Sequence, residues 1–228
     1  SNLIIAGSNY VFDHIHKNYG NLINTKKRLL VIFRGINTEY FDNSNITNEK
    51  VQTLYSLLNL KSEKFKILLP GRLTSWKGQE MFLESLEKLK KIAPDIDFLA
   101  VILGSDQGRN IFKKKLLRLV DQYRLLNEVK FVDGIALMPV AYKVSTVVVS
   151  SSVEPEAFGR VSVEAQAMGK IIVASDLGGS KETIVKGKSG FLYNKRAKAI
   201  RCNCPPDKPS PSFEIRVSRL FSSLFFNL

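Results

Sequence analysis

The sequence predicts an α/β protein with a doubly wound parallel sheet, and three observations lead to that fold class. Several apolar runs of strand length are continuous rather than alternating, as in a parallel sheet that is buried on both faces. Longer stretches with apolar residues at helical spacing lie between these runs. The apolar fraction is 44% over 228 residues, which is sufficient for a sizeable core. The alternation of the two patterns favours a sheet with helices on both faces.

Seven segments are expected to form the strands. They are rich in β-branched and other apolar residues, which suit buried strands. None approaches the roughly 18–20 apolar residues that a membrane-spanning helix requires. In chain order they are LLVIF (29–33), FKILLP (65–70), DFLAVILG (97–104), VKFVDG (129–134), TVVVSS (146–151) and KIIVAS (170–175), with SGFLY (189–193) as the weakest.

Three stretches between these runs are expected to be helices. Residues 78–93 repeat apolar side chains at three- and four-residue spacing, and residues 108–126 do the same with a basic outer face. Residues 161–169 end in Gly169, a typical glycine at a helix C-terminus. The helices therefore follow the strands in the order that a βαβ sheet needs.

Both ends of the chain depart from this alternation. Residues 1–28 hold one strand-like start, LIIAGS, and one expected helix, YVFDHIHKNYG, which together look like the end of a preceding unit. Residues 195–228 lose the periodicity and hold four of the eight prolines, so we expect an atypical basic tail without regular structure. We divide the chain into residues 1–28, a main domain at 29–194, and the tail at 195–228.

The charge and the cysteines limit the classes of protein. A formal net charge of +13 indicates an anionic partner, which can be a nucleic acid, an anionic lipid surface or a phosphorylated small molecule. The chain lacks a nucleic-acid-binding motif and the interleaving of aromatic and basic residues, which disfavours nucleic acid. The N-terminus lacks the pattern of a secretory signal peptide. The two cysteines, Cys202 and Cys204, form no metal motif with histidine, and a reducing, cytoplasmic setting is expected.

The first candidate binding segment is GRLTSWKG (71–78), which follows the expected strand 65–70. Ligands of doubly wound sheets bind outside the carboxyl ends of the strands. Gly71 permits a close turn, and Arg72 and Lys77 place two cations beside a helix N-terminus, which itself favours anions. The segment therefore indicates a diphosphate site. The alternative interpretation is two solvated surface cations.

The second candidate segment, EPEAFGRVSVEAQ, follows the strand at 146–151. A helix is expected to begin near Gly159, so that the backbone N–H groups around Phe158 and Gly159 can bind oxygen. Glu156 would precede this helix and Glu164 would lie within it. Carboxylates accept hydrogen bonds from sugar and ribose hydroxyls. The alternative is a capping acid and a helix acid that pairs with a nearby cation.

A third candidate segment, DLGGSKETI (176–184), follows the strand at 170–175. Gly178 and Gly179 precede a short expected helix, so their N–H groups can approach a phosphate or a sugar. The alternative is an ordinary strand–turn–helix junction. The sequence contains no G-x-G-x-x-G fingerprint, which counts against a dinucleotide-dependent dehydrogenase.

The order of these motifs resembles that of the family-4 retaining glycosyltransferases. The resemblance covers residues 4–194 and depends on E-x7-E with an internal F-G, on G-R-x4-K-G and on G-G-x-x-E. Such enzymes have the GT-B architecture, in which two Rossmann-like domains face each other across the active site. The resemblance implies that residues 29–194 are the C-terminal, nucleotide-sugar-binding domain, and that residues 1–28 are the last part of the N-terminal acceptor domain.

The resemblance also assigns roles to residues of this sequence. Arg72 and Lys77 would hold the donor diphosphate and stabilise the charge of the leaving group, and Glu156 would contact hydroxyls of the transferred sugar. Glu164 would bind the nucleotide ribose, and the segment at 131–134 would border the base. The chain departs from the family pattern at Ala157, where glycine is usual, and in the tail.

The implied reaction is retaining transfer of a hexosyl-type group from a nucleotide-diphosphate sugar, such as a UDP- or GDP-sugar, without metal or cofactor. The implied acceptor is a glycan or a lipid-linked molecule, in synthesis of cell-envelope polysaccharide or lipopolysaccharide. The resemblance implies a cytoplasmic protein, with peripheral association at the inner face of the membrane. The alternative is a truncated, non-catalytic remnant that binds only the nucleotide or nucleotide sugar, since transfer requires both substrates to be held together.

Overall fold

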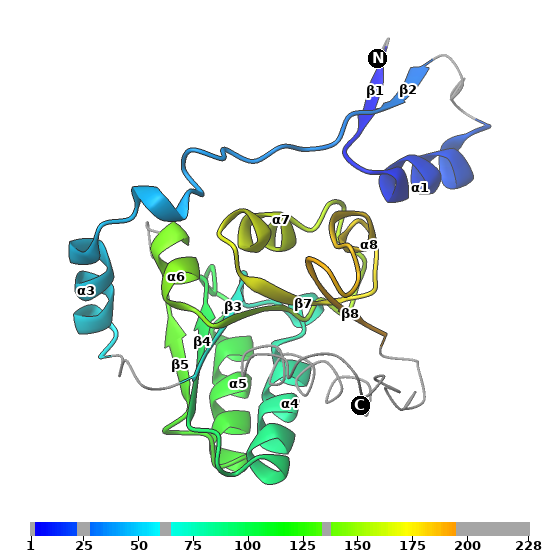
Figure 1. The fold of residues 1–228 in the computed structure, drawn as a ribbon. Coiled ribbons are helices and arrows are strands. Elements are labelled where there is room, and N and C mark those ends of the chain that lie inside the picture. Colours follow the sequence, from blue (N-terminus) through cyan, green and yellow to red (C-terminus); the bar gives the residue numbers. More distant parts are fainter. Residues whose placement is uncertain (1–2, 22–27, 60–64, 134–137, 195–228) are drawn as a thin grey trace, which may run out of the picture.

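The computed structural model describes residues 3–21, 28–59, 65–133 and 138–194. A six-stranded sheet with the order β5-β4-β3-β6-β7-β8 forms its centre, and every neighbouring pair is parallel. Helices cover both faces of this sheet, as Figure 1 shows. The expected doubly wound α/β fold is therefore confirmed. The tail at 195–228 lies outside the described residues.

All seven expected strand segments contain a strand. The run at 65–70 coincides with β3, and the other strands end within two residues of the expected bounds. The strands of the large sheet are β3 (Phe65–Pro70), β4 (Phe98–Leu103), β5 (Val129–Val132), β6 (Val147–Ser150), β7 (Ile171–Ser175) and β8 (Gly190–Tyr193), while β1 (Ile4–Ala6) and β2 (Leu29–Val31) lie apart from it.

The expected helices are also present, and the structure adds two more. The unexpected ones are α3 (Asn48–Leu57), which buries only Leu54, and the short α6 (Met138–Val144). The others are α1 (Asn9–Tyr19), α4 (Gln79–Ile92), α5 (Asn110–Gln122), α7 (Arg160–Ala167) and α8 (Ser180–Thr183), with 3₁₀ turns η1 (Asn43–Asn45) and η2 (Ser75–Lys77). Neither α3 nor α6 has the long apolar stripe that makes a helix recognisable in a sequence. None of the described helices could cross a lipid bilayer.

The strand order places the candidate segments at one point of the sheet. The chain runs outward from β3 to β4 and β5, and then returns so that β6 pairs with the other side of β3. The strand order thus reverses between β3 and β6, and ligands of such sheets bind at this reversal. The segments 71–78 and 151–159 leave the carboxyl ends of these two strands.

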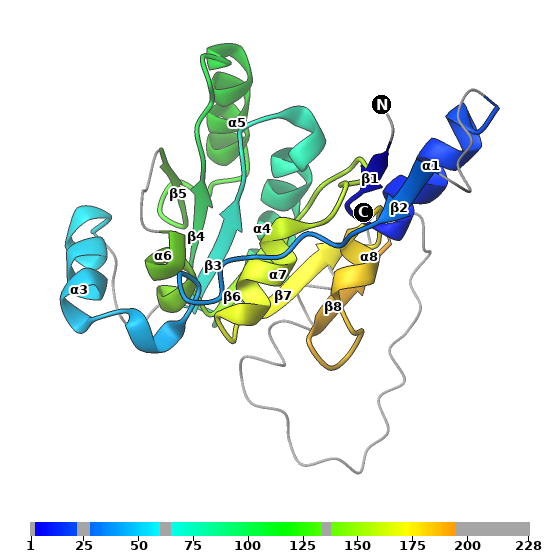
Figure 2. The same cartoon turned by 90° about the horizontal axis from the view of Figure 1, so that it is seen from above.

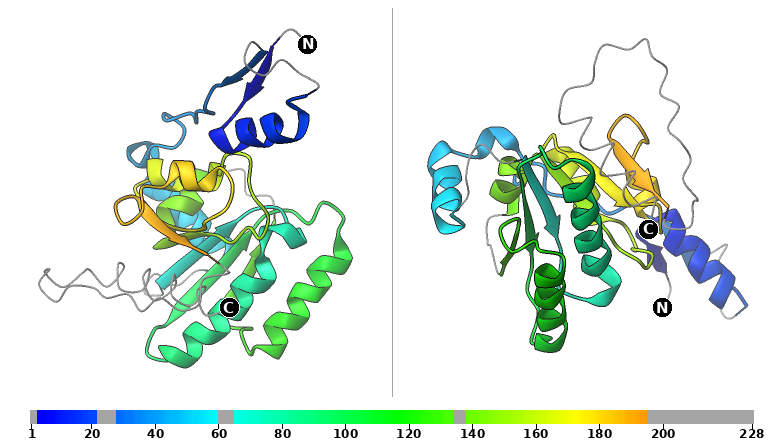
Figure 3. Two further views of the ribbon diagram at one scale, coloured as in Figure 1. Left: turned by 90° about the vertical axis from the view of Figure 1, so that its right-hand side faces the viewer. Right: turned by 90° about the horizontal axis from the view of Figure 1, so that it is seen from below.

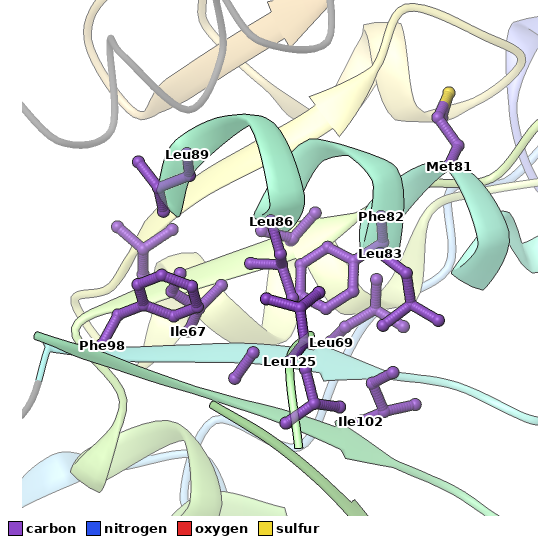
Figure 4. Packing of buried hydrophobic residues seen from close by; sticks show 14 of the residues in the cluster. Ile67, Leu69, Met81, Phe82, Leu83, Leu86, Leu89, Phe98, Ile102 and Leu125 are labelled. Carbon is purple, nitrogen blue, oxygen red and sulfur yellow. The ribbon is translucent and has the colours of Figure 1, made fainter. Parts of the chain in front are cut away.

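The core consists of two layers, one on each face of the sheet. Alternate residues of a strand point to opposite faces, so Ile67 and Leu69 pack against α4 and α5, whereas Leu68 packs with α6 and α7. Figure 4 shows Phe82 and Leu86 of α4 directed into the first layer. The continuous apolar runs are explained by this burial on both faces.

Replacing Phe82 by alanine is expected to lower the free energy of unfolding by about 3–5 kcal/mol, because the substitution leaves a cavity in the first layer. Phe82 is 0% exposed. Urea denaturation measures the change. The matched control is Ile92→Ala at the end of the same helix, where Ile92 is 59% exposed, and a change of about 0.5 kcal/mol or less is expected. Equal losses in the two variants would contradict the described core.

Residues 3–21 and 28–31 form a separate small unit, here called the N-terminal unit. β1 and β2 pair in parallel, and α1 packs against them. The unit lies beside α8, and residues 32–42, which include a turn at 38–41, connect it to the rest of the chain (Figures 1 and 3). β2 therefore pairs with β1 and not with the large sheet, whereas the division predicted from the sequence places residues 29–33 in the main domain. The division of the chain into domains remains a prediction.

Candidate functional site

The segment 71–78 is fixed to the end of β6 by hydrogen bonds. The Gln79 side chain donates to the backbone carbonyl of Arg72 at 2.8 Å, which closes the loop. The Ser151 hydroxyl donates to the carbonyls of Lys77 and Gly78 at 2.9 and 3.1 Å. Gly78 has φ +71°, and a side chain there would overlap the Ser151 carbonyl. The position of Lys77 is thus determined by a rigid backbone.

Both cations of this segment lie near one aromatic ring. The Lys77 ammonium is 4.5 Å and the Arg72 guanidinium 5.9 Å from the centre of the Trp76 ring. Such contacts orient a cation without neutralising its charge. Arg72 is exposed, and within the described part of the chain it makes no ion pair. Gly71 lies close to Lys77, since a side chain at Gly71 would begin 3.5 Å from its Cδ.

Lys77 meets the first acid of the second candidate segment. Its Nζ donates to Glu156 Oε1 at 2.7 Å, and the two side chains are 15% and 10% exposed. The Ser152 hydroxyl donates to the same oxygen. The structure therefore brings together a cation and a carboxylate that are 79 positions apart in the sequence. Partial burial increases the Coulomb attraction between the two charges and also the cost of removing them from water.

The glycine pair of the third segment lies directly against Glu156. Gly178 forms a parallel bridge with Glu156, and the Gly179 N–H donates to the Glu156 carbonyl at 2.7 Å. A side chain at Gly178 would overlap the Glu156 backbone, and one at Gly179 would lie 2.6 Å from the carbonyl oxygen of Ala157. These contacts explain why both positions are glycine and hold the two loops together.

The expected start of α7 is confirmed at Gly159, which caps the helix with φ +84°. Phe158 is buried, and a side chain at Gly159 would begin 2.7 Å from Ser180 Oγ. Glu156 precedes the helix and Glu164 lies inside it, as expected.

Glu164 belongs to a second group of contacts. Its carboxylate accepts hydrogen bonds from the Tyr142 hydroxyl at 2.8 Å and from Arg160 at 3.1 Å. The side chain also lines a cavity of about 470 Å³, together with Met138, Arg160 and residues of the segment 34–41. Lys77 and Glu156 are not among the residues that line this cavity. The four charged candidates therefore form two groups rather than one direct network.

Tyr142 keeps Glu164 in place as a neutral hydrogen-bond donor. Tyr142 is fully buried and contacts Phe41 edge to face. Burial raises the pKa of Tyr142 well above its ordinary value, and the neighbouring Glu164 carboxylate raises this pKa further. The hydroxyl therefore retains its proton at physiological pH.

Replacing Tyr142 by phenylalanine is expected to lower the free energy of unfolding by about 1–2 kcal/mol, because a buried carboxylate oxygen loses its donor while the ring packing is retained. Thermal and urea denaturation measure the loss. Tyr19→Phe is the matched control, since Tyr19 is 50% exposed. If the two variants are equally stable, the Tyr142–Glu164 bond does not contribute to stability.

Sequence reasoning missed three parts of this arrangement. Tyr142 lies in the apolar stretch MPVAYKV, and Ser152 lies in the run SSS, so neither has a local signal for a polar contact. The segment 34–41 was not assigned to a site. At the expected base-binding segment, Phe131 and Val132 belong to β5, while residue 134 lies outside the described residues. Among the described residues no group of three or more His, Cys, Asp or Glu could hold a metal ion.

Comparisons with known proteins agree with this arrangement of fold and motifs. The family model described as "Glycosyl transferases group 1" matches residues 56–201. A D-inositol 3-phosphate glycosyltransferase from Paenarthrobacter aurescens is 34% identical over 141 residues, which cover 61% of this chain and 34% of that protein.

Two solved structures are similar over most of the chain. A glycosyltransferase from Rickettsia africae has a TM-score of 0.79 and 31% identity, over 99% of this chain and 55% of its own. Anabaena Alr3699/HepE in complex with UDP and glucose has a TM-score of 0.74 and 27% identity, over 85% of this chain and 50% of its own. The chain thus spans about a third to a half of the length of these relatives.

Proposed function

Since the chain belongs to the group 1 glycosyl transferases and its parallel α/β sheet matches glycosyltransferases of known structure, we propose that it binds a nucleotide-diphosphate sugar and supplies the donor side of glycosyl transfer. The observation that carries this proposal is the contact of Lys77 with Glu156 beside Arg72, at the point where the strand order of the sheet reverses. A cation for phosphate and an acid for sugar hydroxyls lie side by side there.

The diphosphate would lie against Arg72 and Lys77. Breaking the bond between the sugar and the diphosphate increases the negative charge on the leaving oxygens. Fixed cations stabilise that charge more in the transition state than in the bound substrate, which accelerates the reaction. Arg72 is the more accessible of the two cations, and Lys77 is oriented by Glu156 and Trp76.

The transferred sugar would lie near Glu156, and the nucleotide ribose near Glu164. Each of these carboxylates has oxygens that can accept hydrogen bonds from hydroxyl groups. The cavity beside Glu164 has a volume of about 470 Å³, which suits a small ligand. The relative from Anabaena, whose complex holds UDP and glucose, supports a UDP-sugar as the first candidate donor.

The finer assignments form part of the same proposal. They are membership of the family-4 retaining enzymes, metal-independent transfer of a hexosyl-type group, and a glycan or lipid-linked acceptor in cell-envelope synthesis. They also include a cytoplasmic location with peripheral membrane association, and the role of residues 29–194 as the C-terminal, donor-binding half. The order of motifs supports the family assignment, and the charge of +13 is compatible with an anionic membrane surface.

A second candidate function is binding of the nucleotide sugar without transfer. The candidate residues that the structure places, Lys77, Glu156 and Glu164 among them, are all assigned to the donor, and none of the described residues is assigned to an acceptor. Transfer requires that an acceptor be held in line with the donor. An assay with radiolabelled donor and a supplied acceptor domain separates the two candidates.

Calorimetric titration tests donor binding directly. UDP and UDP-glucose are expected to bind more tightly than inorganic pyrophosphate, because the ribose and the base add contacts near Glu164. The same titration with GDP and GDP-mannose shows whether the site prefers uracil or guanine as the base of the nucleotide. A site that attracts anions only through the net charge of the chain would bind UDP and pyrophosphate equally and would lose both at high salt. That result would reject the proposal.

A further inference from the structure

The N-terminus of α1 is held by an acid from a distant segment. The backbone N–H groups of Asn9 and Tyr10 donate to the Glu182 carboxylate at 2.8 and 2.7 Å, and the Asn9 side chain donates to it at 2.9 Å. Glu182 lies in α8, more than 170 positions away. Figure 2 shows α8 beside α1.

A second contact joins the same helix to the loop 155–159. Ser8 caps α1 by accepting a hydrogen bond from the Val11 N–H at 3.2 Å, and its hydroxyl donates to the carbonyl of Ala157 at 2.5 Å. Ser8 is 0% exposed. The first N–H groups of α1, which have no partner within the helix, are thus bound by Glu182 and Ser8.

These polar contacts matter for the position of α1 because its apolar side chains, such as Val11, Phe12 and Ile15, are only partly buried. None of the residues of α1 is buried, and its first turn contains no acid of its own. A carboxylate near a helix N-terminus interacts favourably with the helix dipole. Glu182 supplies that charge from α8. Together with the hydrogen bond from Ser8 to Ala157, this contact joins the N-terminal unit to the part of the chain that follows the connecting residues 32–42.

The partners of α1 are parts of the candidate site. Ala157 follows Glu156, whose carbonyl accepts a hydrogen bond from the Gly179 N–H. Gly179 in turn caps the helix that carries Glu182. A change in the conformation of the loops around Glu156 therefore moves both acceptors that hold α1.

We propose that Glu182 is a positioning residue that fastens the N-terminal unit to the loops of the candidate site, so that a ligand held by these loops also restrains α1. The contact of Glu182 with α1 in the free protein does not depend on the proposed function. The expectation that a bound nucleotide restrains α1 rests on that proposed function. This contact would set the orientation of the N-terminal unit over the donor.

Residue-resolved amide hydrogen exchange of the full chain tests the proposal. In Glu182→Ala, the Tyr10 amide is expected to exchange about fivefold faster, because its acceptor is removed, while amides of β3 keep their rates. Glu182→Gln retains one acceptor oxygen and should give an intermediate rate. The matched control is Glu49→Ala, which removes an exposed acid from the first turn of α3 and should leave Tyr10 unchanged.

The same measurement with saturating UDP tests the coupling. UDP is expected to slow exchange of the α1 amides in the wild-type chain and to have no such effect in Glu182→Ala.

Three results would contradict parts of this proposal. If the exchange rate of the Tyr10 amide in the free Glu182→Ala variant rises by less than about twofold, Glu182 does not hold α1. Slowing of Tyr10 by UDP to the same extent in both chains would overturn the coupling through Glu182. If UDP changes the exchange rate of no amide in the loops around Glu156, the proposed nucleotide site is rejected. The comparison of the wild-type chain with Glu182→Ala in the absence of UDP still tests whether Glu182 holds α1.

Discussion

Replacing Lys77 by alanine is expected to weaken UDP binding by about tenfold to a hundredfold, as measured by calorimetry. A charge-assisted hydrogen bond to phosphate is worth about 1.5–3 kcal/mol. The substitution also leaves Glu156, whose side chain is 10% exposed, without its partner at 2.7 Å. The unpaired carboxylate would then repel the diphosphate, which adds to the loss. Arg72→Ala is expected to weaken binding in the same direction, because it removes the more exposed cation.

Lys91→Ala is the matched control for these variants. Lys91 lies in the last turn of α4 and pairs with Glu87 at 2.6 Å, and its side chain is 69% exposed. The substitution removes the same charge at a site away from the segment 71–78, so UDP affinity should change by about twofold or less at physiological salt. If Lys91→Ala and Lys77→Ala weaken binding equally, the effect is one of net charge and the site is elsewhere.

Replacing Gly78 by alanine is expected to lower the free energy of unfolding by about 2–5 kcal/mol. Gly78 has φ +71°, a conformation that L-residues rarely adopt, and a Cβ atom would overlap the backbone of Ser151. The backbone at Ser151 lies at the end of β6 and cannot yield without distorting the sheet. Because Lys77 is the preceding residue, UDP binding should weaken in the same variant. Chemical denaturation and calorimetry measure the two effects.

Gly108→Ala separates the two causes of this loss. Gly108 has φ +79°, close to that of Gly78, but a side chain there would meet no atom within 4 Å. In Gly108→Ala only the cost of the positive φ should remain, so the free energy of unfolding should fall by about 1–2 kcal/mol and the UDP affinity should not change. A loss in Gly78→Ala no larger than in Gly108→Ala would show that the contact with Ser151 imposes no constraint.

The sequence predicted the large sheet well because its strands are buried on both faces. A run such as FKILLP is apolar throughout, and the pattern identifies it without knowledge of its neighbours. The pairing of β2 with β1 was not predictable in this way, since an apolar run carries no information about its partner. The helices α3 and α6 were missed because one buries a single leucine and the other has seven residues.

At the candidate site, the sequence indicated which loops leave the same edge of the sheet, and the structure brings Lys77, Glu156 and the glycine pair into contact. Their roles toward a donor stay predictions. The long-range contacts of Tyr142 with Glu164 and of Glu182 with α1 could not be predicted, because each joins residues that are ordinary in their own segments. Such contacts depend on the tertiary packing of helices against the sheet.

A crystal structure of the chain with UDP tests the central claim most directly. We expect the diphosphate to lie within hydrogen-bonding distance of Arg72, Lys77 and the backbone N–H groups around Gly159, with the ribose hydroxyls on Glu164. Density for UDP at any other surface, with the segments 71–78 and 156–164 free of ligand, would contradict the account.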